Sequence, residues 1–130
     1  MKKTDSKLLF DSSAWIEYFF TGKKELIDYV ESGEFSLISS VISIYEVGKK
    51  LVFEKYSEKE INDALNFIKE NSLLIYVDEE LAEDALKIYA KYKLHMADSL
   101  IYATALKTDS TVITLDNDFK KLNKTIFLGK

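Results

Sequence analysis

The sequence of 130 residues contains no cysteine and no proline. Without cysteine, neither a disulfide framework nor a thiolate metal site is available, and this absence is typical of proteins in a reducing compartment. The absence of proline removes one class of helix breaker and excludes nothing more. We therefore expect a cytoplasmic protein that is stabilised by its hydrophobic core and not by covalent cross-links.

Long hydrophobic runs are also missing. No stretch approaches the roughly 18 apolar residues that a membrane-spanning helix needs. The apolar run at residues 8–10 follows Lys2 and Lys3, but it is too short for the central segment of a signal peptide. We expect a soluble protein without a membrane segment.

The net charge is −4, and 47% of the residues are hydrophobic. This balance excludes a disordered acidic tail and a strongly basic nucleic-acid-binding chain, so any contact with nucleic acid must be local. A chain of this length buries about two-thirds of the surface that it exposes when unfolded. We expect one domain over residues 1–130, since no linker or repeat divides the chain.

Short β-branched or apolar runs alternate with segments of helical periodicity. The runs predict strands at residues 8–10, 35–39, 73–77 and 111–115, with a possible fifth at 125–128. The helices are expected at residues 13–20, before Gly33, around Val47, after a Ser57/Glu60 capping box, from Asp78 to about Tyr92, and at 95–106. Because strands alternate with helices, we predict a three-layer α/β/α fold with a parallel sheet of four to five short strands.

Acidic residues follow the predicted strands or lie near the starts of helices. Asp11 ends the first strand, Glu46 lies one turn into the helix after the second, and Asp98 lies near the amino end of helix 95–106, whose buried face is expected at residues 97, 100, 101, 104 and 105. Asp116 and Asp118 follow the fourth strand. Carboxylates gathered at the carboxyl edge of a sheet would repel one another unless a cation lay among them. An all-oxygen set, with no cysteine and no suitably paired histidine, favours Mg²⁺ or Mn²⁺ over zinc.

Each acid also has an ordinary structural explanation. Asp11 fits a helix N-cap, and Glu46 lies at capping-box spacing from Ser43. Asp98 suits the helix dipole, and the two acids of the segment LDND suit Asx turns. If these roles were the only ones, the chain would be a catalytically idle binding module that acts through a protein or RNA partner.

Four segments resemble the motifs of PIN-domain nucleases, and within that family the small single-domain toxins of the VapC type. They are FDSSAWIEYF, VISIYEVGKKL, HMADSLIYATAL and VITLDNDF, in the family's order and spread over almost the whole chain. The resemblance implies an Mg²⁺-dependent or Mn²⁺-dependent endoribonuclease that leaves 5′ phosphates. It also implies a toxin–antitoxin pair, with an antitoxin as a partner, and a homodimer.

The same resemblance assigns roles to individual residues. It implies that the residues that bind the metal and catalyse the reaction are Asp11, Glu46, Asp98 and Asp116. Asp118 would be an auxiliary metal-binding acid. Ser12 would form a hydrogen bond to a carboxylate that binds the metal.

Basic and aromatic residues are candidates for contacts with the substrate. One group of lysines follows Glu46 and another follows Asp118. Either group could contact RNA phosphates or simply form a solvated face. The groups are Lys49, Lys50, Lys55 and Lys59, and Lys120, Lys121 and Lys124. Of these, Lys49 and Lys50 are the predicted RNA-binding residues. The aromatic residues at 15 and 18–20 are expected in the core. His95, the only histidine, is expected to mark a helix entrance and not to transfer protons.

Overall fold

The computed structural model describes residues 6–130, in which five short strands form one parallel sheet. The strands are β1 (Lys7–Phe10), β2 (Ser36–Ser40), β3 (Leu73–Ile75), β4 (Thr111–Thr114) and β5 (Thr125–Phe127). Their order across the sheet is β3-β2-β1-β4-β5, with β1 at the centre. The predicted parallel sheet is confirmed, including its fifth strand.

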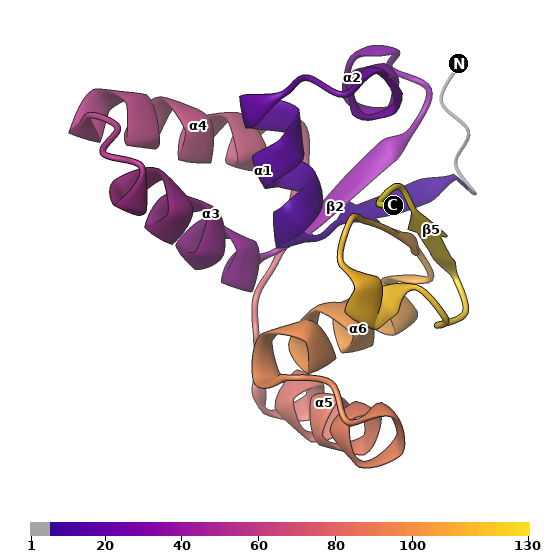
Figure 1. The fold of residues 1–130 in the computed structure, drawn as a ribbon. Helices are drawn as coiled ribbons and strands as arrows, with labels where there is room; N and C mark the ends of the chain where they lie inside the picture. Colours follow the sequence, from indigo (N-terminus) through magenta and orange to yellow (C-terminus); the bar gives the residue numbers. More distant parts are fainter. Residues whose placement is uncertain (1–5) are drawn as a thin grey trace.

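Six α-helices in the described part of the chain cover the two faces of this sheet (Figure 1). They are α1 (Ser12–Phe20), α2 (Lys24–Glu31), α3 (Val41–Phe53), α4 (Glu58–Asn71), α5 (Glu79–Tyr92) and α6 (Met96–Thr108). Helices α1 to α4 lie on one side, and α5 and α6 lie on the other. A short 3-10 helix, η1 (Asn117–Phe119), precedes β5. The three-layer α/β/α prediction is confirmed.

Residues along each central strand point to the two faces in turn. Leu9 of β1 and Ile38 of β2 are register partners, and both pack in the core beneath α5 and α6. Leu8 and Leu37, the preceding partners, pack in the core beneath α1 to α4. This alternation is the ordinary geometry of a strand, and here it supplies a hydrophobic core on both faces.

The aromatic residues of α1 belong mainly to the core, as predicted. Trp15 is fully buried, and its indole Nε1 donates a hydrogen bond of 2.9 Å to Ser39 Oγ. Tyr18 and Phe19 pack against the same core, whereas Phe20 at the end of α1 is partly exposed. The indole therefore ties α1 to β2 from inside the protein.

Several helix starts follow the predicted signals. Ser57 and Glu60 form the complete capping box of α4, and Asp78 caps α5 by accepting a hydrogen bond from the Leu81 amide. The capping-box interpretation of Ser43 and Glu46 is wrong. Helix α3 begins earlier, at Val41, because Ser40 caps it, so Ser43 already lies inside the helix.

Strand β3 is shorter than the run at residues 73–77 suggested. Its last register pair joins Ile75 to Ser40, and Ser40 is also the residue that caps α3. Beyond that pair β2 offers no further backbone partner, and Tyr76 and Val77 leave the sheet with exposed side chains. The apolar run therefore continues after the strand has ended.

Helix α6 is buried more completely than its periodicity predicted. The expectation was one buried face, but all residues from 99 to 105 are buried. The reason is that α6 packs against both the sheet and α5, which leaves little of its middle in contact with solvent. Its ends, in contrast, remain accessible.

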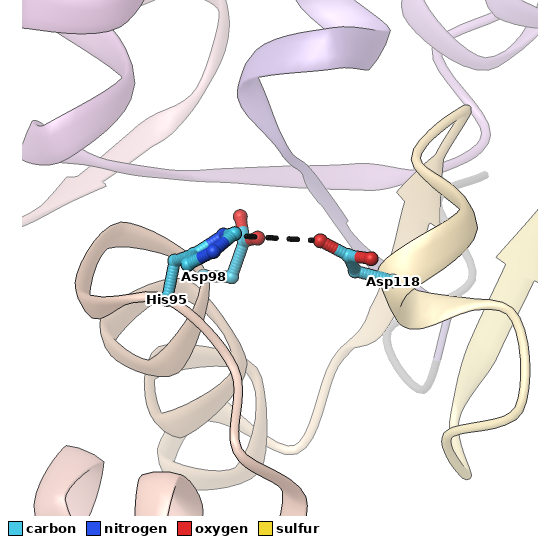
Figure 2. A group of neighbouring side chains, drawn as sticks. All are labelled: His95, Asp98 and Asp118. Carbon is cyan, nitrogen blue, oxygen red and sulfur yellow. Dashed lines mark ion pairs between the residues drawn. The ribbon is translucent and has the colours of Figure 1, made fainter.

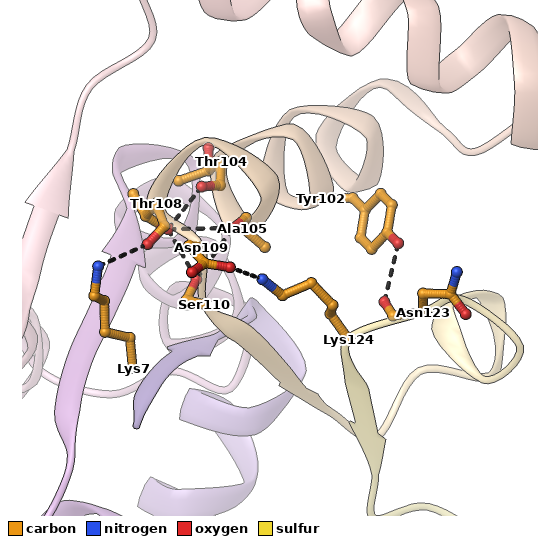
Figure 3. A network of polar contacts seen from close by, with 9 residues as sticks. All are labelled: Lys7, Tyr102, Thr104, Ala105, Thr108, Asp109, Ser110, Asn123 and Lys124. Atoms are coloured by element: carbon orange, nitrogen blue, oxygen red, sulfur yellow. Dashed lines mark hydrogen bonds and ion pairs between the residues drawn. The ribbon is translucent and has the colours of Figure 1, made fainter. Parts of the chain in front are cut away.

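Polar contacts fix the carboxyl end of α6 at the amino-terminal edge of the sheet (Figure 3). Lys7 Nζ donates to the Thr108 carbonyl at 3.2 Å, and Lys124 forms an ion pair with Asp109. Halfway along the helix, Tyr102 donates its hydroxyl hydrogen to the Asn123 carbonyl at 2.9 Å. These contacts leave the amino end of α6, which carries Asp98, at the opposite edge of the sheet.

None of the helices within residues 6–130 is both long enough and apolar enough to cross a membrane.

Candidate functional site

Four acids from separate segments face one cavity at the carboxyl edge of the sheet. Asp11 directly follows β1, Asp116 lies two residues after β4, Glu46 belongs to α3, and Asp98 lies in the first turn of α6. All four line a cavity of about 590 Å³. The structure therefore brings together four of the five acids that the sequence singled out, whereas Asp118 does not line this cavity.

Asp11 is almost fully buried and is held by several hydrogen bonds. As the N-cap of α1, its Oδ1 accepts from the Ala14 amide at 2.9 Å and from Ser13 Oγ at 2.7 Å. Its Oδ2 accepts from Thr114 Oγ1 at 2.5 Å. Asp11 is thus both a helix cap and a wall of the cavity, so the two interpretations of this residue are compatible.

Thr114 connects the acids of two neighbouring strands. Its Oγ1, besides donating to Asp11, accepts a hydrogen bond of 2.9 Å from the Asp116 amide. Asp116 Oδ1 in turn accepts from the Asp118 amide at 2.9 Å, which confirms the expected Asx turn. The sequence analysis did not single out Thr114, although its place at the end of a strand, two residues before Asp116, was an available signal.

Glu46 reaches the cavity from α3 and meets two serines. Ser12 Oγ donates to Glu46 Oε1 at 2.5 Å, and it lies 2.9 Å from Ser43 Oγ. The hydrogen bond from Ser12 is of the kind that the family resemblance implied. Because Ser12 follows Asp11 directly, it couples the orientation of Glu46 to the start of α1.

The crowded acids alter the proton affinity of two of their members. Burial raises the pKa of Asp98 from 3.8 to about 7, with further contributions from the negative charges of Asp116, Asp11, Glu46 and Asp118. Burial also raises the pKa of Asp11 to about 6, although hydrogen bonds from Thr114, Ser13 and the Ala14 amide oppose the rise. The cavity therefore concentrates negative charge at a cost to the ionised forms of both residues.

The lysines named from the sequence lie in different places. Lys49 and Lys50 line the same cavity as the acids. Lys59 forms an ion pair with Asp63, and Lys124 lies at the amino end of β5, where it pairs with Asp109. Since parallel strands place their amino ends at the edge opposite the cavity, Lys124 is remote from the acids.

His95 lies at the start of α6, as expected, but also lies close to Asp118, which the sequence did not predict. It is the N-cap residue of α6, which confirms its place at a helix entrance. However, its Nδ1 lies 4.0 Å from Asp118 Oδ2, and one ligand atom each from His95, Asp98 and Asp118 lie within 4.8 Å of one another. The premise that the chain has no suitably paired histidine is therefore wrong. The available signal was the spacing of three residues between His95 and Asp98 at a helix start.

The donor set fits a divalent cation. Carboxylate oxygens are the ligands that Mg²⁺ and Mn²⁺ accept most readily. Within residues 6–130, no lysine forms an ion pair with any of the four cavity acids, and Lys50 pairs with Glu54. A cation among these acids would offset the repulsion that, in addition to burial, raises the pKa of Asp98.

Comparisons with known proteins agree with this architecture. A family model described as PIN domain matches residues 8–125. The chain is similar to the protein named Ribonuclease VapC1 of Methanocaldococcus jannaschii, with 31% identity over 111 residues that cover 82% of this chain and 73% of that protein.

Two solved structures share the fold at lower sequence identity. One is a toxin–antitoxin complex from Klebsiella pneumoniae, with a TM-score of 0.74, 22% identity, and coverage of 92% of this chain and 95% of that chain. The other is VapC20 of Mycobacterium tuberculosis, described as a sarcin–ricin loop cleaving toxin, with a TM-score of 0.73, 16% identity, and coverage of 89% and 95%.

Proposed function

Because the chain belongs to the PIN-domain family, we propose that it is an endoribonuclease that depends on Mg²⁺ or Mn²⁺ and acts as the toxin of a toxin–antitoxin pair. The observation that carries the proposal is the meeting of Asp11, Glu46, Asp98 and Asp116 around one cavity. The relative named as a ribonuclease supports the same reaction class.

In this proposal the four carboxylates hold the divalent ion, with Asp118 as an auxiliary acid. The bound ion would activate water for attack on an RNA phosphodiester and stabilise the negative charge that develops on the phosphate and the leaving 3′ oxygen. Lys49 and Lys50 on the cavity wall attract the phosphate backbone, which offsets its repulsion by the acids. Cleavage of the bond between phosphorus and the 3′ oxygen leaves a 5′ phosphate on one product and a 3′ hydroxyl on the other.

The direct test is incubation of the purified protein with cellular RNA in Mg²⁺, in Mn²⁺ and in EDTA, followed by sequencing of the new ends. We expect cleavage at defined positions only when a divalent ion is present, with 5′ phosphates on the downstream products. Cleavage that continues in EDTA, or that leaves 2′,3′-cyclic phosphates, contradicts the mechanism. A protein that binds RNA but cleaves none of it would be the idle binding module.

Thr114 has a positioning role that a single substitution can test. Thr114→Val keeps the shape of the side chain but removes the hydroxyl that holds Asp11 and the Asp116 amide. Loss of such an outer contact to metal-binding residues typically lowers metal affinity or activity by about 10- to 100-fold, and we expect a loss of cleavage in this range. The measurement is the cleavage rate as a function of Mn²⁺ concentration.

The matched control for this substitution is Thr114→Ser, which keeps the hydroxyl and loses only a methyl group. We expect the serine variant to retain most of the wild-type cleavage rate and Mn²⁺ affinity. Equal defects in the valine and serine variants would assign the effect to packing and would contradict the positioning role.

The proposed toxin requires a protein that restrains it. The solved relative from Klebsiella pneumoniae is a toxin–antitoxin complex, which supports an antitoxin as the partner of this chain. We also propose a homodimer. Co-expression with the product of the adjacent gene tests the first proposal, and light scattering of the purified protein tests the second.

A further inference from the structure

The group formed by His95, Asp98 and Asp118 lies beside the acid-lined cavity and combines two kinds of donor (Figure 2). His95 and Asp98 come from the start of α6, and Asp118 comes from η1. One nitrogen and two carboxylate oxygens, one from each residue, lie within 4.8 Å of one another. Two segments that are separate in the chain therefore direct three potential metal ligands at one point.

The ordinary structural roles of His95 do not account for this arrangement. An N-cap residue usually accepts a hydrogen bond from an amide in the first turn, but the His95 side chain makes no such bond. Its contact with Asp118 spans 4.0 Å between side chains that are 87% and 51% exposed. An exposed ion pair of this kind contributes little to folding stability.

We propose that His95, Asp98 and Asp118 bind a first-row transition-metal ion such as Mn²⁺, next to the ion held by the four cavity acids. The inference rests on the proposed nuclease centre through two shared residues: Asp118, its auxiliary acid, and Asp98, which lines the cavity. Its carboxylate has two oxygens, so it can contribute to both positions.

The nitrogen ligand determines which metal this second position prefers. Divalent transition-metal ions accept an imidazole nitrogen beside carboxylates more readily than Mg²⁺ does, because Mg²⁺ favours oxygen ligands and retains its water. Three protein ligands leave further coordination positions open to water or to a phosphate oxygen. His95 therefore gives the centre a preference for Mn²⁺ over Mg²⁺ that four carboxylates alone would not give.

Electron paramagnetic resonance of Mn²⁺ bound to the untagged, full-length protein tests the proposal. His95 is the only histidine in the sequence, so a nitrogen hyperfine coupling from imidazole can arise from no other residue. We expect this coupling in the wild type and its loss in His95→Gln. We also expect His95→Gln to weaken Mn²⁺ binding on the order of tenfold while Mg²⁺ binding stays within about twofold of the wild type.

Asp28→Asn is the matched control, because it removes one negative charge from an exposed position on α2. We expect this control to keep the imidazole coupling and the wild-type Mn²⁺ affinity. Mn²⁺ binding without imidazole coupling, or with equal affinity in His95→Gln, overturns the second position. If metal-dependent cleavage survives that result, the nuclease proposal stands. A protein that binds no Mn²⁺ at all overturns both.

Discussion

Asp98→Asn is expected to reduce RNA cleavage by at least about 10²- to 10³-fold, because a bound metal ion contributes several kcal/mol of transition-state stabilisation. Asp98 lines the cavity and lies in the first turn of α6, and an amide in its place cannot supply the negative charge that helps to hold the ion. Without metal, the variant should melt at a higher temperature than the wild type near neutral pH. The substitution removes a carboxylate whose pKa burial and neighbouring acids raise to about 7. Cleavage rates and melting curves in EDTA measure the two effects.

Asp28→Asn also serves as the control for this prediction, since it makes the same chemical change at an exposed residue of α2 that does not line the cavity. It should leave both the cleavage rate and the metal response at wild-type values. If Asp98→Asn cleaved RNA at the normal rate, the proposed role of this carboxylate in metal binding would be wrong. If it lost activity together with stability, a folding defect would explain the loss.

The metal-free wild type is expected to lose stability as the pH rises from about 4 to about 7. Folded Asp98 retains its proton up to about pH 7, whereas an aspartate in the unfolded chain releases it near 3.8. Across this interval the folded state binds more protons than the unfolded state, so the free energy of unfolding decreases with increasing pH. Asp11, with a pKa raised to about 6, acts in the same direction. Urea denaturation in EDTA at several pH values measures the slope.

A divalent ion should reverse this loss near neutral pH, because it binds the ionised carboxylates of the folded state. At a concentration 100 times its Kd, an ion that binds only the folded state adds about 2.7 kcal/mol of stability. For a domain of this size, that corresponds to a rise in melting temperature on the order of 10 °C.

Other acids titrate in the opposite direction. The pKa values of Glu60 and Asp109 are lowered, mainly by hydrogen bonds from the Ser57 amide and from Lys124 respectively, so these residues lose stabilising contacts as the pH falls. These contributions are the same in the wild type and in Asp98→Asn, so they cancel in the difference between the free energies of unfolding of the two proteins. A difference that does not change between pH 4 and 7, or that grows in favour of the wild type, would contradict the assignment.

Much of the fold could be predicted because its local signals agree with one another. The run at residues 8–10, the capping box at Ser57 and the cap at Asp78 each correspond to an element of the structure. The signals failed where tertiary contacts decide the outcome. Ser40 displaced the expected cap of α3, and packing on two sides buried α6 from residue 99 to residue 105.

The candidate site could be predicted only in part, for a similar reason. Acids that follow strands are visible in the sequence, because the ends of parallel strands meet at one edge of the sheet. The hydroxyl of Thr114 and the ring of His95 gain their roles from neighbours that are distant in the chain. Thr114 contacts Asp11 across two strands, and His95 approaches Asp118 across the space between α6 and η1.

The pairing of β1 with β4 sets the spacing of the two strand ends that lead to Asp11 and Asp116. Phe10 is in register with Ile113, and the Asp11 amide still donates to the Ile113 carbonyl at 3.2 Å, so the backbone ladder extends to the cavity. Adjacent strands lie roughly 4.8 Å apart in any sheet. Backbone pairing, and not side-chain packing, therefore fixes the spacing between the ends of β1 and β4 that carry these acids. Substitutions among hydrophobic residues in the layers on either side can accumulate without changing this spacing.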